Sequence, residues 1–365
     1  MAGVYISFPF CAQKCTYCNF ASGVFPRELA RRYLRALRSE LQGYTWGSRP
    51  ETLYLGGGTP GDLETDEVER VLALVPGAPW KEATIEAAPG SITPEKAEAW
   101  RRLGINRVSL GVQSFVPSEI ARTGRKHRAE TVEREVDVLR ASGIDNFNID
   151  LIAGLPGQTP VSWAESLDWI ERLQAPHVSV YMLEVDEDSR LGREILRHGA
   201  RYGASEVPPE DAIADLYETA ASRLRELGLN RYEISNFARP GRESLHNLKY
   251  WRLEPYTGFG ADAHSFDGGV RSKNVETAAE YVARFERGEL PREEEAPADA
   301  AGERFFVGLR LAEGVRPAPE ERRRFEAPIR RFVEQGLLAA DGETLRLTER
   351  GILLSNEVFQ EFVSI

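Results

Sequence analysis

The three cysteines of the chain lie within one short segment, Cys11-Ala-Gln-Lys-Cys15-Thr-Tyr-Cys18, and no other cysteine follows. A disulfide scaffold would spread an even number of cysteines along the chain. Three thiols on one loop in a reducing compartment indicate metal or cluster binding instead. Three thiolates can bind three corners of an iron–sulfur cubane. Structural zinc is the alternative, although zinc normally takes four protein ligands and a histidine would have to supply the fourth.

The spacing of these cysteines, C-x3-C-x2-C directly after an expected strand at residues 4–7, favours the cluster over zinc. A cubane held by three thiolates has one iron without a protein ligand. That open iron can chelate the amino and carboxylate groups of S-adenosylmethionine (SAM), and electron transfer to the sulfonium is chemistry of the cofactor itself. The sequence therefore predicts a [4Fe–4S] cluster with a SAM site beside it.

A glycine run and several polar residues follow the next expected strands. Gly56-Gly57-Gly58-Thr59-Pro60 comes after the strand predicted at residues 52–55, and glycines there let the backbone approach a ligand closely. Glu86, Gln113 and Asp150 stand at the ends of three later strands. A carboxylate in such a place can bind ribose hydroxyls. Each feature alone is also typical of a turn or a cap, but their common register predicts one ligand-binding mouth.

The elements that must position these residues alternate regularly as far as about residue 235. Six strand–helix units are predicted, with strands at residues 4–7, 52–55, 84–87, 107–110, 147–151 and 177–182. Such a series implies parallel strands joined by right-handed crossovers. A doubly wound sheet and a complete or partial barrel both satisfy it. Both kinds of fold place their active sites just after the strands, where the polar residues and glycines stand.

The pattern changes after residue 235. Residues 236–290 are rich in aromatics, glycine and histidine, which predicts a loop-rich segment that packs on the barrel. Residues 291–302 are acidic and rich in proline and alanine, as in a linker. Residues 303–365 read as helices with a hairpin at 341–343, a small winged-helix-like module. We therefore expect a first domain over residues 1–235 and a C-terminal domain over 303–365.

Composition narrows the function classes. The net charge of -11 argues against a general nucleic-acid binder, which needs a basic face. No apolar run approaches the roughly 18 to 20 residues that span a bilayer. The first residues lack the basic region and cleavage site of a signal peptide. A cytoplasmic protein is the expectation.

The cysteine loop resembles the signature of the radical SAM superfamily. Its surroundings, Tyr5-Ile-Ser-Phe-Pro-Phe-Cys11 and Cys18-Asn-Phe20, resemble the oxygen-independent coproporphyrinogen dehydrogenase (HemN-like) branch, and the similarity extends over most of the chain. The resemblance implies an α/β fold: a partial (β/α)6 barrel with a small, mostly helical, winged-helix-like C-terminal domain. It implies that Cys11, Cys15 and Cys18 ligate the cluster. Positions that match SAM contacts are Tyr5, Tyr17, Gly57, Gly58, Thr59 and Glu86, and positions that match contacts to a second SAM are Gln113, Arg125 and Asp150.

Two functions fit this resemblance: a coproporphyrinogen III dehydrogenase and a haem chaperone of the HemW type. Phe20 stands where the dehydrogenase has a further cysteine, and Cys11 comes too early for the dehydrogenase's longer N-terminal arm. The run His246-Asn-Leu-Lys-Tyr250-Trp251 resembles the haem-associated motif of the chaperones. Imidazole is a common axial ligand of haem iron. From composition alone, a structural histidine packed by two aromatics would be favoured; the match to the whole motif favours haem.

The resemblance to the chaperones implies haem as a further cofactor, and delivery of haem to haem-requiring respiratory proteins, including those at the membrane. It makes His246, Tyr250 and Trp251 candidate haem contacts. His264 is a further candidate, for haem or for SAM. A reductant protein such as flavodoxin is an expected partner. No catalytic residue is assigned from the sequence, and the oxidative decarboxylation of coproporphyrinogen III stays the alternative function.

Overall fold

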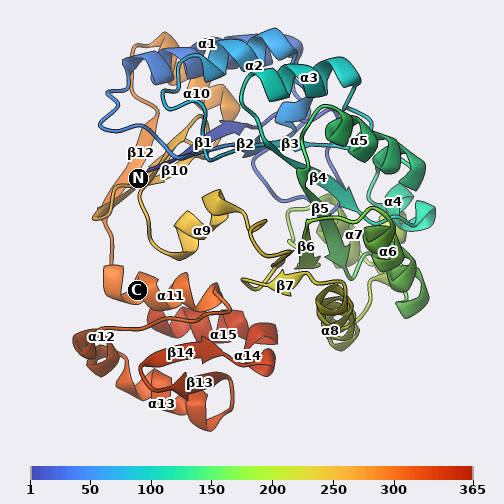
Figure 1. The fold of residues 1–365 in the computed structure, drawn as a ribbon, viewed down its shortest axis with the longest axis vertical. Coiled ribbons are helices and arrows are strands. Elements are labelled where there is room, and N and C mark those ends of the chain that lie inside the picture. The colour runs from blue at the N-terminus through green and yellow to red at the C-terminus, as the bar shows by residue number, and fades with distance from the viewer. Residues whose placement is uncertain (1, 364–365) are drawn as a thin grey trace.

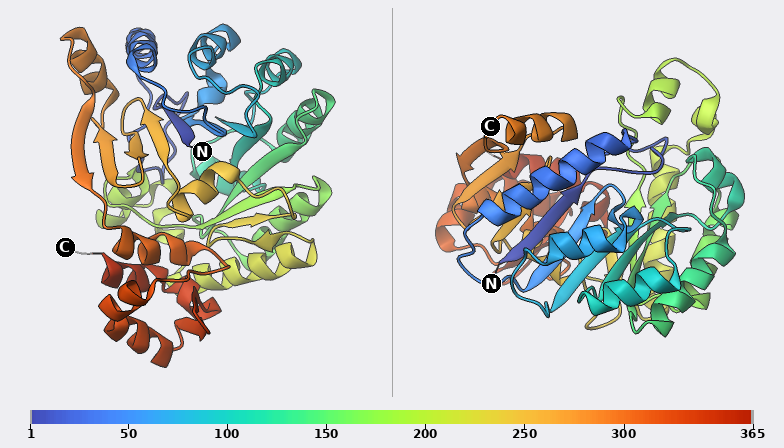
Figure 2. Two further views of the ribbon diagram at one scale, coloured as in Figure 1. Left: turned by 60° about the vertical axis from the view of Figure 1, so that its left-hand side comes forward. Right: turned by 90° about the horizontal axis from the view of Figure 1, so that it is seen from above.

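The computed structural model describes residues 2–363. Within them, a curved sheet of twelve strands carries helices on its convex face (Figures 1 and 2). Its six central strands are β1 (Gly3–Phe8), β2 (Thr52–Gly57), β3 (Glu82–Ala87), β4 (Arg107–Gln113), β5 (Asn146–Ala153) and β6 (His177–Met182). They are neighbours in that order and all parallel. The six predicted strands are therefore present.

The helices that connect these strands are mostly those expected from the 3.6-residue period of apolar residues. They are α1 (Arg27–Gly43), α2 (Thr65–Leu72), α3 (Pro94–Arg102), α5 (Ala129–Ala141), α6 (Pro160–Arg172) and α8 (Glu210–Glu226). Four shorter helices were not predicted: η1 (Pro60–Asp62), α4 (Pro117–Arg122), α7 (Arg190–Leu196) and η2 (Arg201–Glu206). Helices of three to seven residues are too short to show a periodic apolar face.

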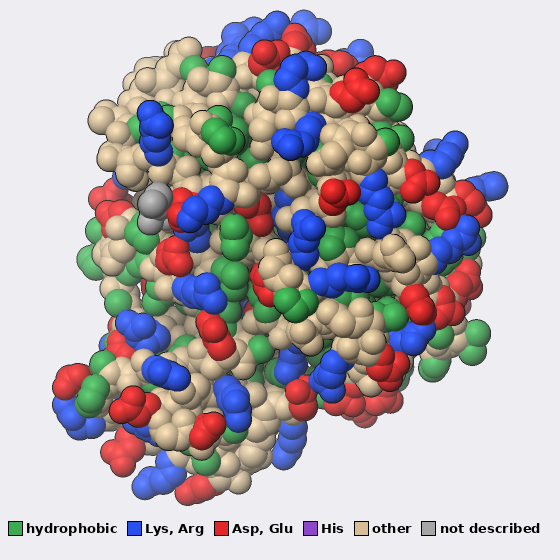
Figure 3. All heavy atoms as spheres, in the orientation of Figure 1, with side chains coloured by type: hydrophobic (Ala, Val, Ile, Leu, Met, Phe, Trp, Pro, Cys, Tyr) green, Lys and Arg blue, Asp and Glu red, His purple; other side chains and the backbone are tan. Residues whose placement is uncertain are grey.

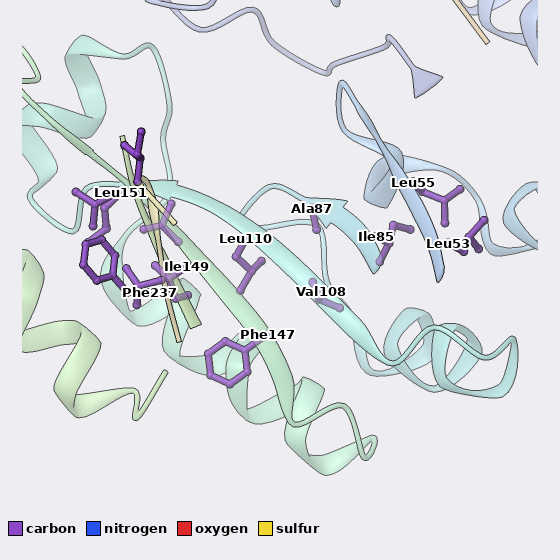
Figure 4. Packing of buried hydrophobic residues seen from close by; sticks show 14 of the residues in the cluster. Leu53, Leu55, Ile85, Ala87, Val108, Leu110, Phe147, Ile149, Leu151 and Phe237 are labelled. Atoms are coloured by element: carbon purple, nitrogen blue, oxygen red, sulfur yellow. The ribbon is translucent and has the colours of Figure 1, made fainter. Parts of the chain in front are cut away.

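Alternation along the strands separates the two faces of the sheet. Alternate residues of β2 to β5, with Phe237, pack against one another and the outer helices in one apolar cluster (Figure 4): Leu53, Leu55, Ile85, Ala87, Val108, Leu110, Phe147, Ile149 and Leu151. The residues between them, such as Glu86, Ser109 and Asp150, are polar and face the concave side. Side chains of successive strand residues point to opposite faces. The helices therefore cover an apolar face, and the lumen is polar.

The sheet is extended at both edges by strands that were not predicted. On one side β9 (Tyr256–Phe259) lies parallel to β1, and β10 (His264–Phe266), β11 (Val270–Asn274) and β12 (Arg292–Pro297) follow antiparallel. On the other side β8 (Asn236–Ala238) and β7 (Asn230–Arg231) follow β6. The two edges do not pair, so the barrel is partial. Segment 236–290 thus contributes strands, besides α9 (Leu245–Trp251) and α10 (Ala278–Glu286), and the expected linker at 291–302 contains β12.

The C-terminal region lies on the concave side of the sheet (Figures 1 and 2). Its elements are α11 (Ala300–Phe306), η3 (Gly308–Arg310), α12 (Pro319–Arg324), α13 (Glu326–Glu334), β13 (Leu338–Asp341), β14 (Thr344–Leu347), α14 (Glu349–Leu353), α15 (Ser355–Phe359) and η4 (Gln360–Phe362). Strands β13 and β14 form the predicted hairpin. Phe305 and Phe362 stack with ring centroids 4.6 Å apart in its core.

Charged side chains of both signs are interspersed over the face of the molecule shown in Figure 3. Among the described residues, no helix has both the length and the apolar character needed to cross a membrane.

Candidate cluster, SAM and haem sites

The cysteines lie on the loop between β1 and α1, which closes on itself. The Cys11 N–H donates to the carbonyl of Gly23 (2.9 Å), and the Gly23 N–H donates to Pro9 (3.0 Å). The Lys14 ammonium donates to the carbonyls of Phe20 and Ser22, both at 2.7 Å. These bonds satisfy the backbone of the loop without using the three thiols, which form no disulfide. The loop is therefore a shaped frame whose sulfur atoms are available as ligands.

Contacts from two other parts of the barrel hold this loop at the mouth. The Thr16 N–H donates to the Thr123 carbonyl (3.1 Å), and the Thr16 carbonyl accepts from the Leu191 N–H (2.8 Å). Arg125 donates through Nε to the Cys15 sulfur (3.2 Å) and through a terminal nitrogen to the Gly111 carbonyl (2.5 Å). A guanidinium beside a thiol stabilises the thiolate, which is the form that ligates iron.

The donor set fits a cubane better than a single ion. Within residues 2–363, no three His, Cys, Asp or Glu side chains converge as ligands of one metal ion. A cubane does not need such convergence, because each thiolate binds a different iron of the cluster. The three cysteines are nevertheless close enough for Cys15 and Cys18 to raise the pKa of Cys11, after the larger effect of burial.

The glycine run packs directly beneath the cysteine loop. A Cβ atom on Gly58 would lie 2.6 Å from the Phe10 carbonyl oxygen, and the Thr59 N–H donates to that same oxygen (2.9 Å). Gly57 has a φ of 98°, which favours glycine, and its Cβ would lie 3.3 Å from the Tyr5 hydroxyl. Glycines at these positions therefore allow the two loops to approach each other closely.

Two partly buried carboxyls, Glu86 and Asp150, face the lumen below this mouth. The Tyr54 hydroxyl donates to Glu86 (2.9 Å), and burial raises the pKa of Glu86 to about 7, with the charge of Asp150 adding to the effect. Asp150 accepts from the Asn148 amide (2.6 Å), and burial raises its pKa too. The guanidinium of Arg107, 1% exposed, opposes both shifts. With a pKa of about 7, Glu86 is partly charged at neutral pH. The oxygens of both carboxyls can accept hydrogen bonds from ammonium or hydroxyl groups.

The remaining predicted SAM positions gather around Arg125. Burial alone would lower the pKa of the Arg125 guanidinium. The neighbouring Tyr17 and Cys15 raise this pKa, so that it lies above its usual value. The Gln113 amide and Arg125 meet at Gly111, where a Cβ would lie 3.1 Å from the amide nitrogen and 3.4 Å from the guanidinium. The structure thus places the predicted cluster and SAM residues around one mouth.

His246 lies at the opposite end of the lumen, where α9 meets the beginnings of β2 and β3. Its Nδ1 is 2.9 Å from the Thr52 hydroxyl, its Nε2 is 2.8 Å from the Tyr250 hydroxyl, and its backbone N–H donates to Glu82 (3.0 Å). The side chain is completely buried, and burial lowers its pKa to about 3. Both ring nitrogens are therefore engaged, and neither faces a cavity.

The other candidate haem residues line a cavity of about 690 Å³ between the barrel and the C-terminal region. Its aromatic wall consists of Tyr5, Tyr250, Trp251, Tyr256, Phe306 and Phe362. His264 and Arg271 also line it. A cavity of this size, mostly apolar with a few polar groups, is typical of a site for an organic cofactor. The sequence pointed to Tyr250, Trp251 and His264, but not to Tyr256, Arg271, Phe306 or Phe362, which lie on elements distant in sequence.

His264 and Trp251, which both line this cavity, differ in their surroundings. Partial burial lowers the pKa of His264, so its imidazole is neutral and able to ligate a metal at neutral pH. Trp251 presents its ring to Arg310, whose guanidinium carbon is 4.6 Å from the ring centroid, and its buried indole N–H has no hydrogen-bond partner among the described residues. The cavity therefore offers one imidazole and several aromatic faces.

Comparisons with known proteins place the chain among its relatives. A model of the radical SAM superfamily matches residues 5–170, and one of the HemN C-terminal domain matches residues 296–354. The heme chaperone HemW of Bacillus subtilis is 33% identical over all of this chain and 99% of its own length, and that of Escherichia coli is 30% identical over 99% and 98%. Coproporphyrinogen III oxidase HemN of Escherichia coli, a radical SAM enzyme, superposes with a TM-score of 0.84 at 22% identity, covering 99% of this chain and 89% of its own.

Proposed function

The chain belongs to the HemW family of the radical SAM superfamily, and we propose that it is a haem chaperone, which binds haem and a [4Fe–4S] cluster and delivers haem to haem-requiring proteins. The observation that carries this proposal is the aromatic cavity, since three of the four candidate haem residues line it. Phe20 adds to it, because the dehydrogenase pattern has a cysteine there and this phenylalanine side chain is 70% exposed on the cluster loop.

Cys11, Cys15 and Cys18 would hold the cluster, which supplies an open iron for SAM and an electron for its sulfonium. Around it, Arg125 offsets the negative charge of the thiolates. Gly57, Gly58 and Thr59 present backbone groups to SAM, with Tyr5 and Tyr17 at its sides. Glu86 accepts hydrogen bonds from SAM amino or hydroxyl groups. Gln113, Arg125 and Asp150 would contact a second SAM.

Haem would lie between the aromatic faces of Tyr250 and Trp251 on one side and the C-terminal region on the other. His264 is the histidine among the residues that line the cavity, and its imidazole would hold the haem iron. His246 would contribute by fixing Tyr250 through the 2.8 Å bond between Nε2 and the hydroxyl. A direct bond from His246 to iron would require α9 to leave Thr52 and Glu82.

This proposal divides the chain by task. Residues 1–235 hold the cluster and SAM, residues 236–290 supply the haem contacts of the barrel side, and residues 303–365 close the cavity. The clients would be respiratory proteins, reached in the cytoplasm or at the membrane surface. A reductant protein of the flavodoxin type would supply electrons to the cluster.

The deciding experiment combines a haem titration with an anaerobic assay that contains coproporphyrinogen III, SAM and a reductant. We expect a Soret band at about one haem per chain, as a single axial-ligand site requires, and no decarboxylated product. His264→Ala should shift the Soret band or weaken binding, whereas His246→Ala, a matched change of a buried histidine, should leave the spectrum of the bound haem unchanged. Robust decarboxylation would establish the dehydrogenase alternative instead.

A further inference from the structure

Arg271, on β11, forms the ion pair at the wall of the haem cavity. Its Nε donates to one oxygen of Glu303 (2.7 Å) and a terminal nitrogen donates to the other (2.8 Å). The two side chains are 32% and 17% exposed. Glu303 comes from α11, the first helix of the C-terminal region, so the pair joins the two walls of the cavity. A fork of two parallel N–H···O bonds is the geometry by which arginine recognises any carboxylate.

The guanidinium of Arg271 is held in place independently of Glu303. Another terminal nitrogen donates to the Tyr256 hydroxyl (3.1 Å), and the guanidinium carbon lies 4.6 Å from the centroid of the Phe266 ring. Both partners belong to the barrel side, on β9 and β10. If Glu303 withdrew, the fork would keep its orientation towards the cavity. The site is therefore preorganised for a second carboxylate.

Among the charged residues of the cavity wall, the ion pair of Arg271 with Glu303 is the one in which a ligand could replace the carboxylate. Among the described lining residues, Arg271 is the only arginine or lysine. The acids Asp262 and Asp299 have cations of their own, Lys273 at 3.2 Å and Arg324 at 2.7 Å. An anionic ligand in this cavity would face three carboxylates and only one cation that points inward. It could bind well only by taking Arg271 from Glu303.

We propose that a propionate of haem exchanges with Glu303 for the fork of Arg271, so that Glu303 occupies the carboxylate place while the cavity is empty. This inference rests on the proposed function, because haem is the ligand that brings a flat apolar body and two carboxylates together. The exchange makes Arg271 the residue that selects porphyrins with free propionates. It also makes Glu303 a built-in competitor that limits affinity, as a protein that must release its cargo requires.

The test compares ferric haem with its dimethyl ester, which has the same macrocycle and iron but no carboxylate. Wild-type protein should bind haem more tightly than the ester. Glu303→Gln removes the competing charge and should tighten haem binding roughly tenfold, as expected for hydrogen bonds to a charged group, while ester binding stays the same. Arg271→Met should weaken haem binding by roughly tenfold and again leave the ester unaffected.

Glu349→Gln is the matched control, because it breaks another ion pair between barrel and C-terminal region, Arg231 with Glu349 at 3.0 Å, away from the cavity wall. Equal effects of Glu303→Gln and Glu349→Gln on haem affinity would show that only the weaker attachment of the C-terminal region to the barrel matters. That result would overturn the exchange. Equal affinity of the wild type for haem and ester would do the same, with haem binding itself intact. Arg271→Lys keeps the charge but not the fork, so it should fall between wild type and Arg271→Met. A wild type that binds neither ligand contradicts the proposed function.

Discussion

The mouth of the barrel and the cavity between the barrel and the C-terminal region are lined by different types of residue. At the mouth, glycines and polar side chains stand at the ends of adjacent parallel strands, and two partly buried carboxyls face the lumen. The cavity instead has a wall of aromatic rings drawn from both halves of the chain. Tyr5 belongs to both regions: its hydroxyl lies near Gly57, and its ring lines the cavity. A polar ligand at the mouth and an apolar ligand in the cavity could therefore bind on either side of the Tyr5 ring.

The largest expected effect is a loss of the cluster that leaves haem binding intact. Cys15→Ala removes one of three ligands, so iron content should fall from about four per chain to nearly none. Haem binding should persist, since no cysteine lines the cavity. Iron and sulfide analysis of anaerobically reconstituted protein, followed by a haem titration, measures both. A parallel loss of iron and haem would mean that the two regions are one site, and stoichiometric zinc in the wild type would exclude the cluster.

The next largest effect concerns His246, where α9 meets the beginnings of β2 and β3. His246→Ala removes a completely buried ring with hydrogen bonds to Thr52 and Tyr250, and it leaves both hydroxyls without that partner. The free energy of unfolding should fall by roughly 3 kcal/mol, from the cavity and the unsatisfied groups together. Denaturant unfolding measures this loss. An unchanged stability with a shifted Soret band would instead make His246 a haem ligand, and the arrangement of α9 seen here would not be the haem-bound one.

The parts of the fold that local pattern encodes were predictable, and those that depend on partners were not. Residues 4–7, with the β-branched Val4 and Ile6, were expected as a strand and lie within β1. β12 contains three consecutive glutamates and is exposed throughout, so nothing in its residues distinguishes it from a linker. Charged side chains are typical of edge strands, which need no apolar face. β9 was equally hard to predict, because it has four residues, one of them Gly258, and becomes a strand by pairing with β1 and β10.

The same division holds for the candidate sites. The cysteines and the glycine run are contiguous motifs, so their chemistry was visible in the sequence. Arg271 and Glu303 are 32 residues apart, on a strand that was not predicted and on a helix of the C-terminal region, and no local pattern links them. The motif around His246 drew attention to the right segment, but the engagement of its ring depends on Thr52, which is 194 residues away. Only the folded chain shows that Tyr250 and Trp251, and not His246, reach the cavity.

A smaller effect distinguishes the mouth by its pH dependence. The pKa of Glu86, raised to about 7 by burial, makes the carboxyl neutral below that pH and charged above it. SAM affinity should therefore increase from about pH 6 to about pH 8, by up to roughly tenfold. Glu86→Gln should flatten the profile at the weaker affinity. Equilibrium titrations of SAM at several pH values, with the haem titration in the same buffers as a control, measure the difference. A wild-type profile that is already flat would remove Glu86 from the SAM site.

Tyr54 offers the finest test, because its hydroxyl contacts Glu86 at the mouth while its ring lies beside Tyr5, which lines the cavity. Its hydroxyl donates to Glu86 (2.9 Å), and its ring lies 6.1 Å from the Tyr5 centroid and 5.4 Å from that of His246. Tyr54→Phe removes only the hydroxyl. That hydrogen bond lowers the pKa of Glu86, so its loss should raise the pKa further and leave less carboxylate at neutral pH.

Loss of a hydrogen bond that stabilises the carboxylate by about 1 kcal/mol raises the pKa of Glu86, so SAM binding by Tyr54→Phe should weaken by roughly threefold at neutral pH. The deficit should shrink as the pH rises and Glu86 ionises again. Haem affinity should not change, because the ring that supports Tyr5 and His246 remains. The measurement is a pair of SAM titrations at neutral and alkaline pH with one haem titration. A haem affinity that moves together with SAM affinity would show that the shared aromatic wall couples the two sites, and the separation between mouth and cavity would then be structural but not energetic.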